Sequence, residues 1–153
     1  MKPEYKKILF CSDFSLDADY AFHTALDMAE RYGARLYLLH VLSARDYIAD
    51  DLEDRPEARK DDPDDRKTIE QAKQKLIDRY LHRLGGYPQY EFQVLKGVPI
   101  VEIVRFARGQ EVDLIVLGAA GSSKSNKLHF GSTAENVARR AQCTVMCIRN
   151  PKQ

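Results

Sequence analysis

Two kinds of hydrophobic pattern alternate along the chain. Nearly continuous apolar runs of about four to eight residues are typical of strands buried on both faces, and apolar residues spaced three and four apart are typical of helices with one buried face. The runs predict strands at 7–11, 36–42, 114–117 and 144–148. The alternation of apolar and polar residues at 90–95 predicts a further strand, nearer the edge of a sheet.

Helices are predicted between these strands. The first starts at an N-cap, Ser15, ends at Gly33 and buries one face, made of Ala18, Ala21, Phe22, Ala25, Ala29 and Tyr32. The second covers 68–84 and turns inward Ala72, Leu76, Tyr80 and Leu84. The third starts near Pro99 and buries Ile100, Ile103, Val104 and Ala107. The last has a core stripe of Ala134, Val137, Ala138 and Ala141.

The order of these elements predicts the fold class. Strands that alternate with helices and are apolar almost throughout are typical of an α/β protein with a parallel sheet covered on both faces. Ligands of such sheets bind outside the carboxyl ends of the strands, where the strand order reverses. Asp13, Leu42 and Gly118 follow or end three of the predicted strands. We therefore expect any ligand site at that edge of the sheet.

Length and composition narrow the class of protein. The 153 residues suit one domain, 1–153, and the 44% apolar and 31% charged residues are those of an ordinary globular protein. A net charge of +1 gives no reason to expect nucleic acid or an anionic membrane as partner. With no apolar run near the roughly 20 residues that span a bilayer and no signal-like N-terminal segment, we expect a cytoplasmic location. The cysteines, Cys11, Cys143 and Cys147, lack zinc-like spacing, so we expect apolar packing and no metal site.

One segment departs from the alternating pattern. Ten acidic and three basic residues lie between Asp46 and Asp65, together with Pro56 and Pro63. The simplest interpretation is a solvated, flexible connection at about 43–67. A flap over the ligand edge or a loop for docking a partner is the alternative, although acidic side chains would repel a polyphosphate.

The glycine-rich segment after the fourth strand carries the main functional signal. Gly118 and Gly121 are followed by Gly131, Ser132 and Thr133 at the start of the last helix. Glycines let backbone N–H groups approach an anion, and a helix start adds unpaired N–H groups and the positive end of its dipole. Ser132 also begins a capping box with Glu135, so the segment has a structural explanation as well as a phosphate-binding one. The P-loop pattern is absent, because no glycine stands directly before Lys124.

The spacing of these glycines, with its flanking segments, resembles the universal stress protein family. The resemblance extends over the first strand to Asp13, the second strand to Val41, and the segments 97–99, 113–118 and 141–148. It implies a single-domain, doubly wound, five-stranded parallel sheet of strand order 3-2-1-4-5, with ATP, with or without Mg²⁺, across the carboxyl ends of strands one and four. It also implies a homodimer through the last strand, Thr144–Ile148. Carried over by position, the nucleotide-binding residues are Asp13, Val41, Gly118, Gly121, Gly131, Ser132 and Thr133.

Three functions are compatible with this pattern. The first is an ATP-binding, dimeric stress-response or signalling module. The second is slow ATP hydrolysis or phosphoryl transfer at the same edge, with Lys124 and Lys127 helping and Ser132 as a possible acceptor; no base or water-positioning residue is evident. The third is a scaffold without nucleotide, against which the intact glycines argue. Ala119 and Ala120 depart from the family, in which many members carry a bulky or basic residue at these places.

Overall fold

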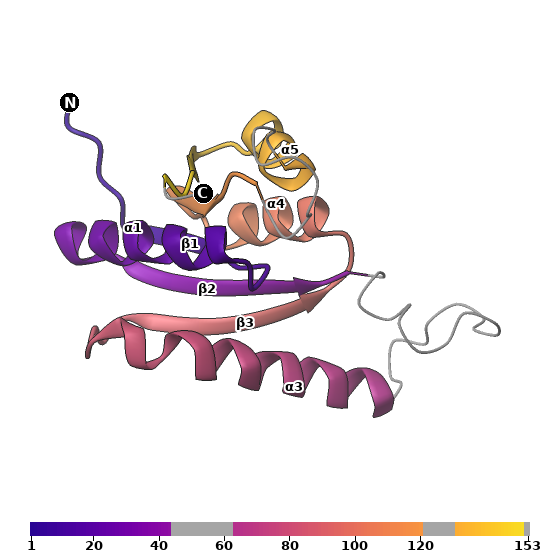
Figure 1. The fold of residues 1–153 in the computed structure, drawn as a ribbon. Coiled ribbons are helices and arrows are strands. Elements are labelled where there is room, and N and C mark those ends of the chain that lie inside the picture. The colour runs from indigo at the N-terminus through magenta and orange to yellow at the C-terminus, as the bar shows by residue number, and fades with distance from the viewer. Residues whose placement is uncertain (44–62, 121–130, 152–153) are drawn as a thin grey trace.

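The computed structural model describes residues 1–43, 63–120 and 131–151 (Figure 1). In chain order the elements are β1 (Lys7–Cys11), α1 (Leu16–Tyr32), β2 (Arg35–Leu42), α3 (Pro63–Tyr80), the 3₁₀ turn η1 (His82–Leu84), β3 (Tyr90–Lys96), α4 (Pro99–Gly109), β4 (Leu114–Gly118), α5 (Ser132–Arg140) and β5 (Thr144–Ile148). The acidic connection lies for the most part outside the described residues. Its last part differs from the expectation, because α3 begins at Pro63 and not at Thr68.

The five strands form one parallel sheet in the order β3-β2-β1-β4-β5, as the family resemblance implied. β1 lies at the centre, where Phe10 is in register with Leu38 of β2 and Val116 of β4. β3 and β5 are the outer strands, which confirms the edge position expected for 90–95. Parallel pairing brings the carboxyl ends of all five strands to one edge of the sheet.

Helices cover both faces of the sheet. α1 and α3 pack on one face and α4 and α5 on the other, and in Figure 1 α3 runs beside β3 while α4 and α5 lie together. Side chains of β1 alternate between the two cores: Ile8 and Phe10 belong to the α1/α3 side, Leu9 and Cys11 to the α4/α5 side. None of the helices in the described ranges is both long and apolar enough to cross a membrane.

The ends of the helices follow the sequence signals in part. Ser15 caps α1 and accepts a hydrogen bond from the Ala18 N–H at 3.1 Å, and Gly33 ends it in the left-handed region at φ 63°. The predicted helix over 68–84 is interrupted, because α3 ends at Tyr80 and a separate 3₁₀ turn still brings Leu84 into the core. Two apolar positions are exposed, contrary to expectation: Tyr32, at 43% exposure, and Ala138.

The capping box predicted at α5 is wrong. Gly131, with φ −64° and ψ 146°, is the N-cap, and within the part of the chain that the structure describes no side chain caps the helix. Ser132 is instead the first helical residue, because the extended backbone conformation that defines an N-cap falls one residue earlier. Glu135 forms an ion pair with Arg139 at 2.8 Å and does not reach back to the helix start.

Candidate functional site

The strand order reverses between β1 and β4. From β1 the chain proceeds through β2 to β3 on one side, and β4 and β5 lie on the other. The carboxyl ends of β1 and β4 are therefore neighbours at the switch point, which is where parallel α/β sheets bind ligands. The turn that contains Asp13 follows β1, and the chain from Gly118 to α5 follows β4. The structure therefore brings Asp13 and Gly118 to the same edge of the sheet.

Asp13 lies exposed in the β1–α1 turn. Its Oδ1 accepts a hydrogen bond from the Ser15 N–H at 3.0 Å. One carboxylate oxygen thus helps to shape the turn that leads into α1. The carboxylate is thus oriented by its own backbone at the carboxyl edge.

Phe14 adopts an uncommon backbone conformation in the same turn. Its φ is 64°, in the left-handed region that a bulky side chain rarely enters. Its ring lies 4.4 Å from the His40 ring, centroid to centroid, and the Lys75 ammonium lies 4.2 Å above it. Residues held in such conformations are concentrated at functional sites.

A buried polar network stands behind this turn. The Ser12 and Tyr80 hydroxyls are 2.7 Å apart, and the Phe14 N–H donates to the Ser12 Oγ at 3.1 Å. The Tyr80 hydroxyl donates to Asp19 at 2.9 Å. His40 is buried, and its Nδ1 lies 2.7 Å from the Ser12 carbonyl oxygen. The network joins β1, β2, α1 and α3.

Asp19 connects this network to the charges of α3. Arg79 holds it with two hydrogen bonds, at 2.7 and 2.6 Å, and Arg83 lies 3.6 Å away. Burial opposes ionisation of the carboxyl, but the hydrogen bonds from Arg79 and Tyr80 outweigh burial, so the pKa of Asp19 lies below its ordinary value. Burial raises the pKa of the Tyr80 phenol, and the adjacent carboxylate raises it further. Both groups therefore keep their neutral-pH protonation states.

Sequence reasoning did not find this network. The sequence predicted Tyr80 only as an inward residue of the helix over 68–84. It predicted no role for Asp19 or Arg79. The apolar periodicity of α3 indicates that Tyr80 is buried, but it carries no information about which group its hydroxyl meets. Ser12 and Tyr80 are 68 residues apart.

The second candidate segment follows β4. A Cβ placed on Gly118 would lie 3.0 Å from the carbonyl carbon and Cβ of Asp17, so this glycine lets the start of α1 approach β4. A Cβ on Gly131 would lie 3.0 Å from the Ala120 carbonyl oxygen, and the Gly131 N–H donates to the Ala119 carbonyl at 2.6 Å. Close packing thus accounts for a glycine at both positions. Their contact with phosphate stays a prediction.

The remaining candidates are distributed around this edge. Ser132 is exposed and Thr133 half-buried in the first turn of α5, next to Gly131. Val41 is buried near the end of β2, in register with Leu95. Gly121, together with Lys124 and Lys127, lies outside the described residues. Within the described ranges, no three His, Cys, Asp or Glu side chains are grouped to hold a metal ion.

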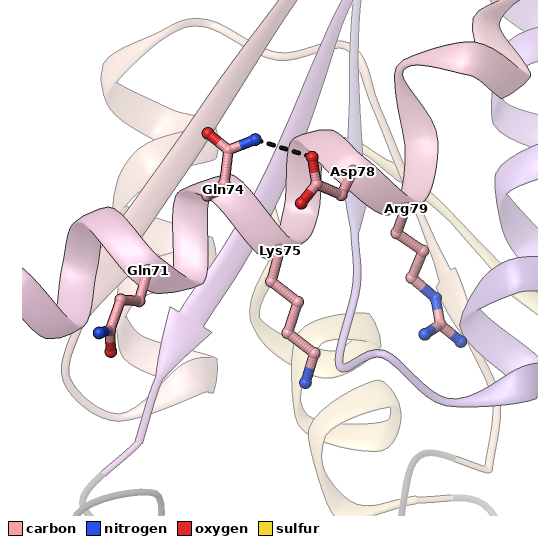
Figure 2. Close-up of a pocket in the computed structure, with 5 residues that line it drawn as sticks. All are labelled: Gln71, Gln74, Lys75, Asp78 and Arg79. Atoms are coloured by element: carbon pink, nitrogen blue, oxygen red, sulfur yellow. Dashed lines mark hydrogen bonds between the residues drawn. The ribbon is translucent and has the colours of Figure 1, made fainter.

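A surface hollow lies on α3, away from the described glycines. It measures about 510 Å³ and is lined by Gln71, Gln74, Lys75, Asp78 and Arg79. Figure 2 shows Lys75 and Arg79 extending from the same side of the helix, while Gln74 donates to Asp78 at 2.7 Å. All five lining residues belong to one helix, so the hollow is shallow. Lys75 and Arg79 extend over the Phe14 ring, which places cations beside the β1–α1 turn.

The cysteines fit the apolar interpretation. All three are free thiols: Cys11 is buried in β1, Cys147 lies in β5 and Cys143 just before it. Burial raises the pKa of each thiol above its ordinary value. Because the thiolate is the reactive form, all three are expected to be inert at neutral pH.

The fold is that of a doubly wound α/β protein, with Asp13 and Gly118 at the switch point of its sheet. Known proteins of similar sequence and structure identify its family. The chain belongs to the universal stress protein family, whose model matches residues 4–149. It is 29% identical over 149 residues to the universal stress protein MJ0531 of Methanocaldococcus jannaschii, covering 97% of this chain and 85% of that protein. The universal stress protein UspA from Lactobacillus plantarum has a similar structure, with a TM-score of 0.76 at 29% identity, covering 97% and 100% of the two chains.

Two structures with the same fold contain an adenine nucleotide. A universal stress protein in complex with cAMP is 21% identical, with a TM-score of 0.65, and the match covers 96% of this chain and 98% of that one. The universal stress protein from Archaeoglobus fulgidus in complex with dAMP is 22% identical, with a TM-score of 0.64 and coverage of 95% and 99%. At these identities the likeness extends to the fold, and the nucleotides belong to those proteins.

Proposed function

We propose that this chain binds ATP at the carboxyl edge of its sheet, between the β1–α1 turn and the start of α5. The nucleotide-binding residues are then Asp13, Val41, Gly118, Gly121, Gly131, Ser132 and Thr133. The observation that carries the proposal is the switch point between β1 and β4, because Asp13 follows β1 and Gly118 ends β4 at this same edge. Family membership and the cAMP and dAMP complexes of two relatives support a nucleotide as the ligand.

The start of α5 supports a phosphate group at this edge. The first N–H groups of a helix have no partner within the helix. In α1 the Ser15 hydroxyl accepts from one of them, whereas no side chain of the described residues caps α5. The N–H groups of Ser132 and Thr133 are in this first turn, and the helix dipole favours an anion beside them. Mg²⁺ would arrive on the phosphates of the nucleotide, where it offsets their charge.

Charge placed at the start of α5 gives a direct test. An acidic residue in a first turn favours the helix but repels phosphate. We expect Ser132→Asp to keep or raise the melting temperature and to weaken ATP binding at least tenfold in calorimetric titration. The matched control is Val101→Asp, an exposed position in the first turn of α4, which should bind ATP as the unmodified protein does.

The unmodified protein gives the basic readout. ATP at 100 times its dissociation constant should add roughly 2.7 kcal/mol of stability, which corresponds to a rise in melting temperature of about 5–10 °C. Titration with ADP and AMP in parallel shows how many phosphates contribute. No heat and no thermal shift at millimolar ATP would refute nucleotide binding. Equal weakening by Ser132→Asp and Val101→Asp would refute a phosphate at the start of α5.

We further propose that the protein acts as a cytoplasmic homodimer in a stress response, pairing through β5. β5 is an outer strand of the sheet, and an apolar outer strand is suited to pair with another chain. Sedimentation equilibrium should give twice the chain mass of 17.5 kDa. A species at the monomer mass throughout the micromolar range would refute the dimer.

A further inference from the structure

The turn that carries Asp13 is supported by a helix distant in sequence. The Phe14 N–H donates to Ser12 Oγ at 3.1 Å, and Ser12 Oγ lies 2.7 Å from the Tyr80 hydroxyl. Asp13 lies in sequence between Ser12 and Phe14, the two residues of the turn that the first of these bonds joins. Tyr80, the last residue of α3, thus contacts the turn through Ser12, and its ring is fully buried.

The direction of each hydrogen bond in this network follows from its partners. The Asp19 carboxylate can only accept, so the single Tyr80 proton is donated to Asp19. The Tyr80 oxygen must then accept the Ser12 proton, and the Ser12 oxygen accepts from the Phe14 N–H. Donors and acceptors point the same way along the whole chain, an arrangement in which each bond polarises the next. Arg79 completes it by holding Asp19 in place.

The left-handed backbone of Phe14 needs such support. A bulky residue at φ 64° costs of order 1–3 kcal/mol and persists only where the surroundings determine it. The surroundings here are the Ser12 bond on the N–H and the His40 and Lys75 contacts on the ring. Without the Tyr80 hydroxyl, Ser12 Oγ loses its fixed orientation, and the N–H of Phe14 loses a fixed acceptor. The turn that carries Asp13 then loses one of its supports, although the hydrogen bond between Asp13 and the Ser15 N–H remains.

We propose that Tyr80 is a positioning residue for the nucleotide site: through Ser12 it holds the β1–α1 turn in the conformation that presents Asp13 to the ligand. This inference rests on the proposed function, because it assigns the control of affinity at that same site to a residue that does not touch the ligand. It goes further by making α3 part of the site. The hydrogen-bond chain, and not packing alone, is what α3 contributes.

Tyr80→Phe is the central variant, because it removes one hydroxyl and keeps the ring. We expect ATP affinity to fall about three- to tenfold in calorimetric titration, the factor that one net hydrogen bond supplies. The matched control is Tyr87→Phe. The Tyr87 hydroxyl donates to the Ala29 and Ala34 carbonyls, near the amino-terminal ends of the strands. This control should lower the melting temperature and leave ATP affinity unchanged.

A second measurement separates positioning from general loosening. If Tyr80 acts through the Asp13 turn, Tyr80→Phe should weaken ATP binding in the unmodified protein but add no further loss in an Asp13→Ala background. A structural defect would add the same loss in both backgrounds. Ser12→Ala should reproduce the Tyr80→Phe effect, and the double variant should lose no more than either single one.

The outcomes distinguish the two proposals. If the unmodified protein binds no nucleotide, the proposed function fails, and the positioning role fails with it. If it binds ATP and Tyr80→Phe binds equally well, the positioning role alone is overturned. Equal losses in Tyr80→Phe and Tyr87→Phe, or additive losses with Asp13→Ala, overturn it as well. A loss confined to Tyr80→Phe and Ser12→Ala, and absent in the Asp13→Ala background, supports it.

Discussion

Gly118→Ala tests how closely α1 approaches the end of β4. The added methyl carbon would lie 3.0 Å from the carbonyl carbon and Cβ of Asp17 and 3.2 Å from the Ala18 nitrogen. These atoms belong to the start of α1 and not to the end of a flexible side chain. The helix start cannot swing away easily, since Ser15 caps it and Ala18 is 2% exposed. The clash must therefore be relieved by a shift of backbone.

Overpacking of this kind costs about 1–3 kcal/mol. For a chain of this size, each kcal/mol lowers the melting temperature by about 2–4 °C, so we expect a drop of about 2–12 °C. Thermal unfolding followed by far-ultraviolet circular dichroism, without nucleotide, measures it. Gly109→Ala is the control, because a Cβ at Gly109 meets no atom within 4 Å. This variant should be as stable as the unmodified protein, or more stable by up to about 1 kcal/mol.

An unchanged melting temperature in Gly118→Ala would refute the close approach of α1 to β4. The expected result also bears on the ligand. If Gly118→Ala moves the start of α1, it also moves the β1–α1 turn, so a loss of ATP binding in that variant would not by itself identify Gly118 as a phosphate contact. For this reason Ser132→Asp is the sharper test of the phosphate position.

Two further variants test the energetics of the described residues. Because the folded pKa of Asp19 lies below its unfolded value near 3.8, its ionisation contributes stability that is present above that value and is lost as pH falls through the lower folded pKa. In urea unfolding we therefore expect Asp19→Asn to be less stable than the unmodified protein at pH 7 and to lose less stability on acidification. Parallel plots of unfolding free energy against pH for the two proteins below about pH 4 would contradict this. Glu111 follows Gln110, the C-cap of α4, and is exposed with φ 57°, so Glu111→Gly should raise the free energy of unfolding by up to about 1 kcal/mol. A lower urea midpoint would show that the Glu111 backbone is not strained.

The hydrophobic pattern predicted the helices and strands well because it indicates which residues of an element are buried. An element buries nearly the same residues whichever neighbouring elements it packs against. The run at 114–117 is buried along its whole length in β4, and the stripe of α1 from Ala18 to Ala29 faces the core. Where burial is incomplete the pattern fails. Tyr32 sits at the end of its helix with 43% of its surface exposed, although its spacing matches the buried stripe.

Local signals succeeded where the residue alone decides the conformation. Gly33 ends α1 in the left-handed region, as its position predicted, and Ser15 caps the other end. At α5 the same reasoning failed, since the backbone at Gly131 forms a hydrogen bond with the carbonyl of Ala119, twelve residues earlier in the chain. A cap depends on backbone angles, and at this helix those angles depend on tertiary contacts.

The candidate site divides in the same way. The amino-acid sequence by itself determined the strands, the buried faces of the helices and the run of glycines after β4, because these depend on composition and spacing over a few residues. Only the tertiary structure decided that Gly118 accommodates α1, that Asp13 is bonded to its own turn, and that Ser12, Tyr80 and Asp19 form one hydrogen-bonded chain. Ser12 and Tyr80 meet across 68 residues of chain, and the partner of a buried hydroxyl is set by the packing of whole elements, which no local pattern encodes.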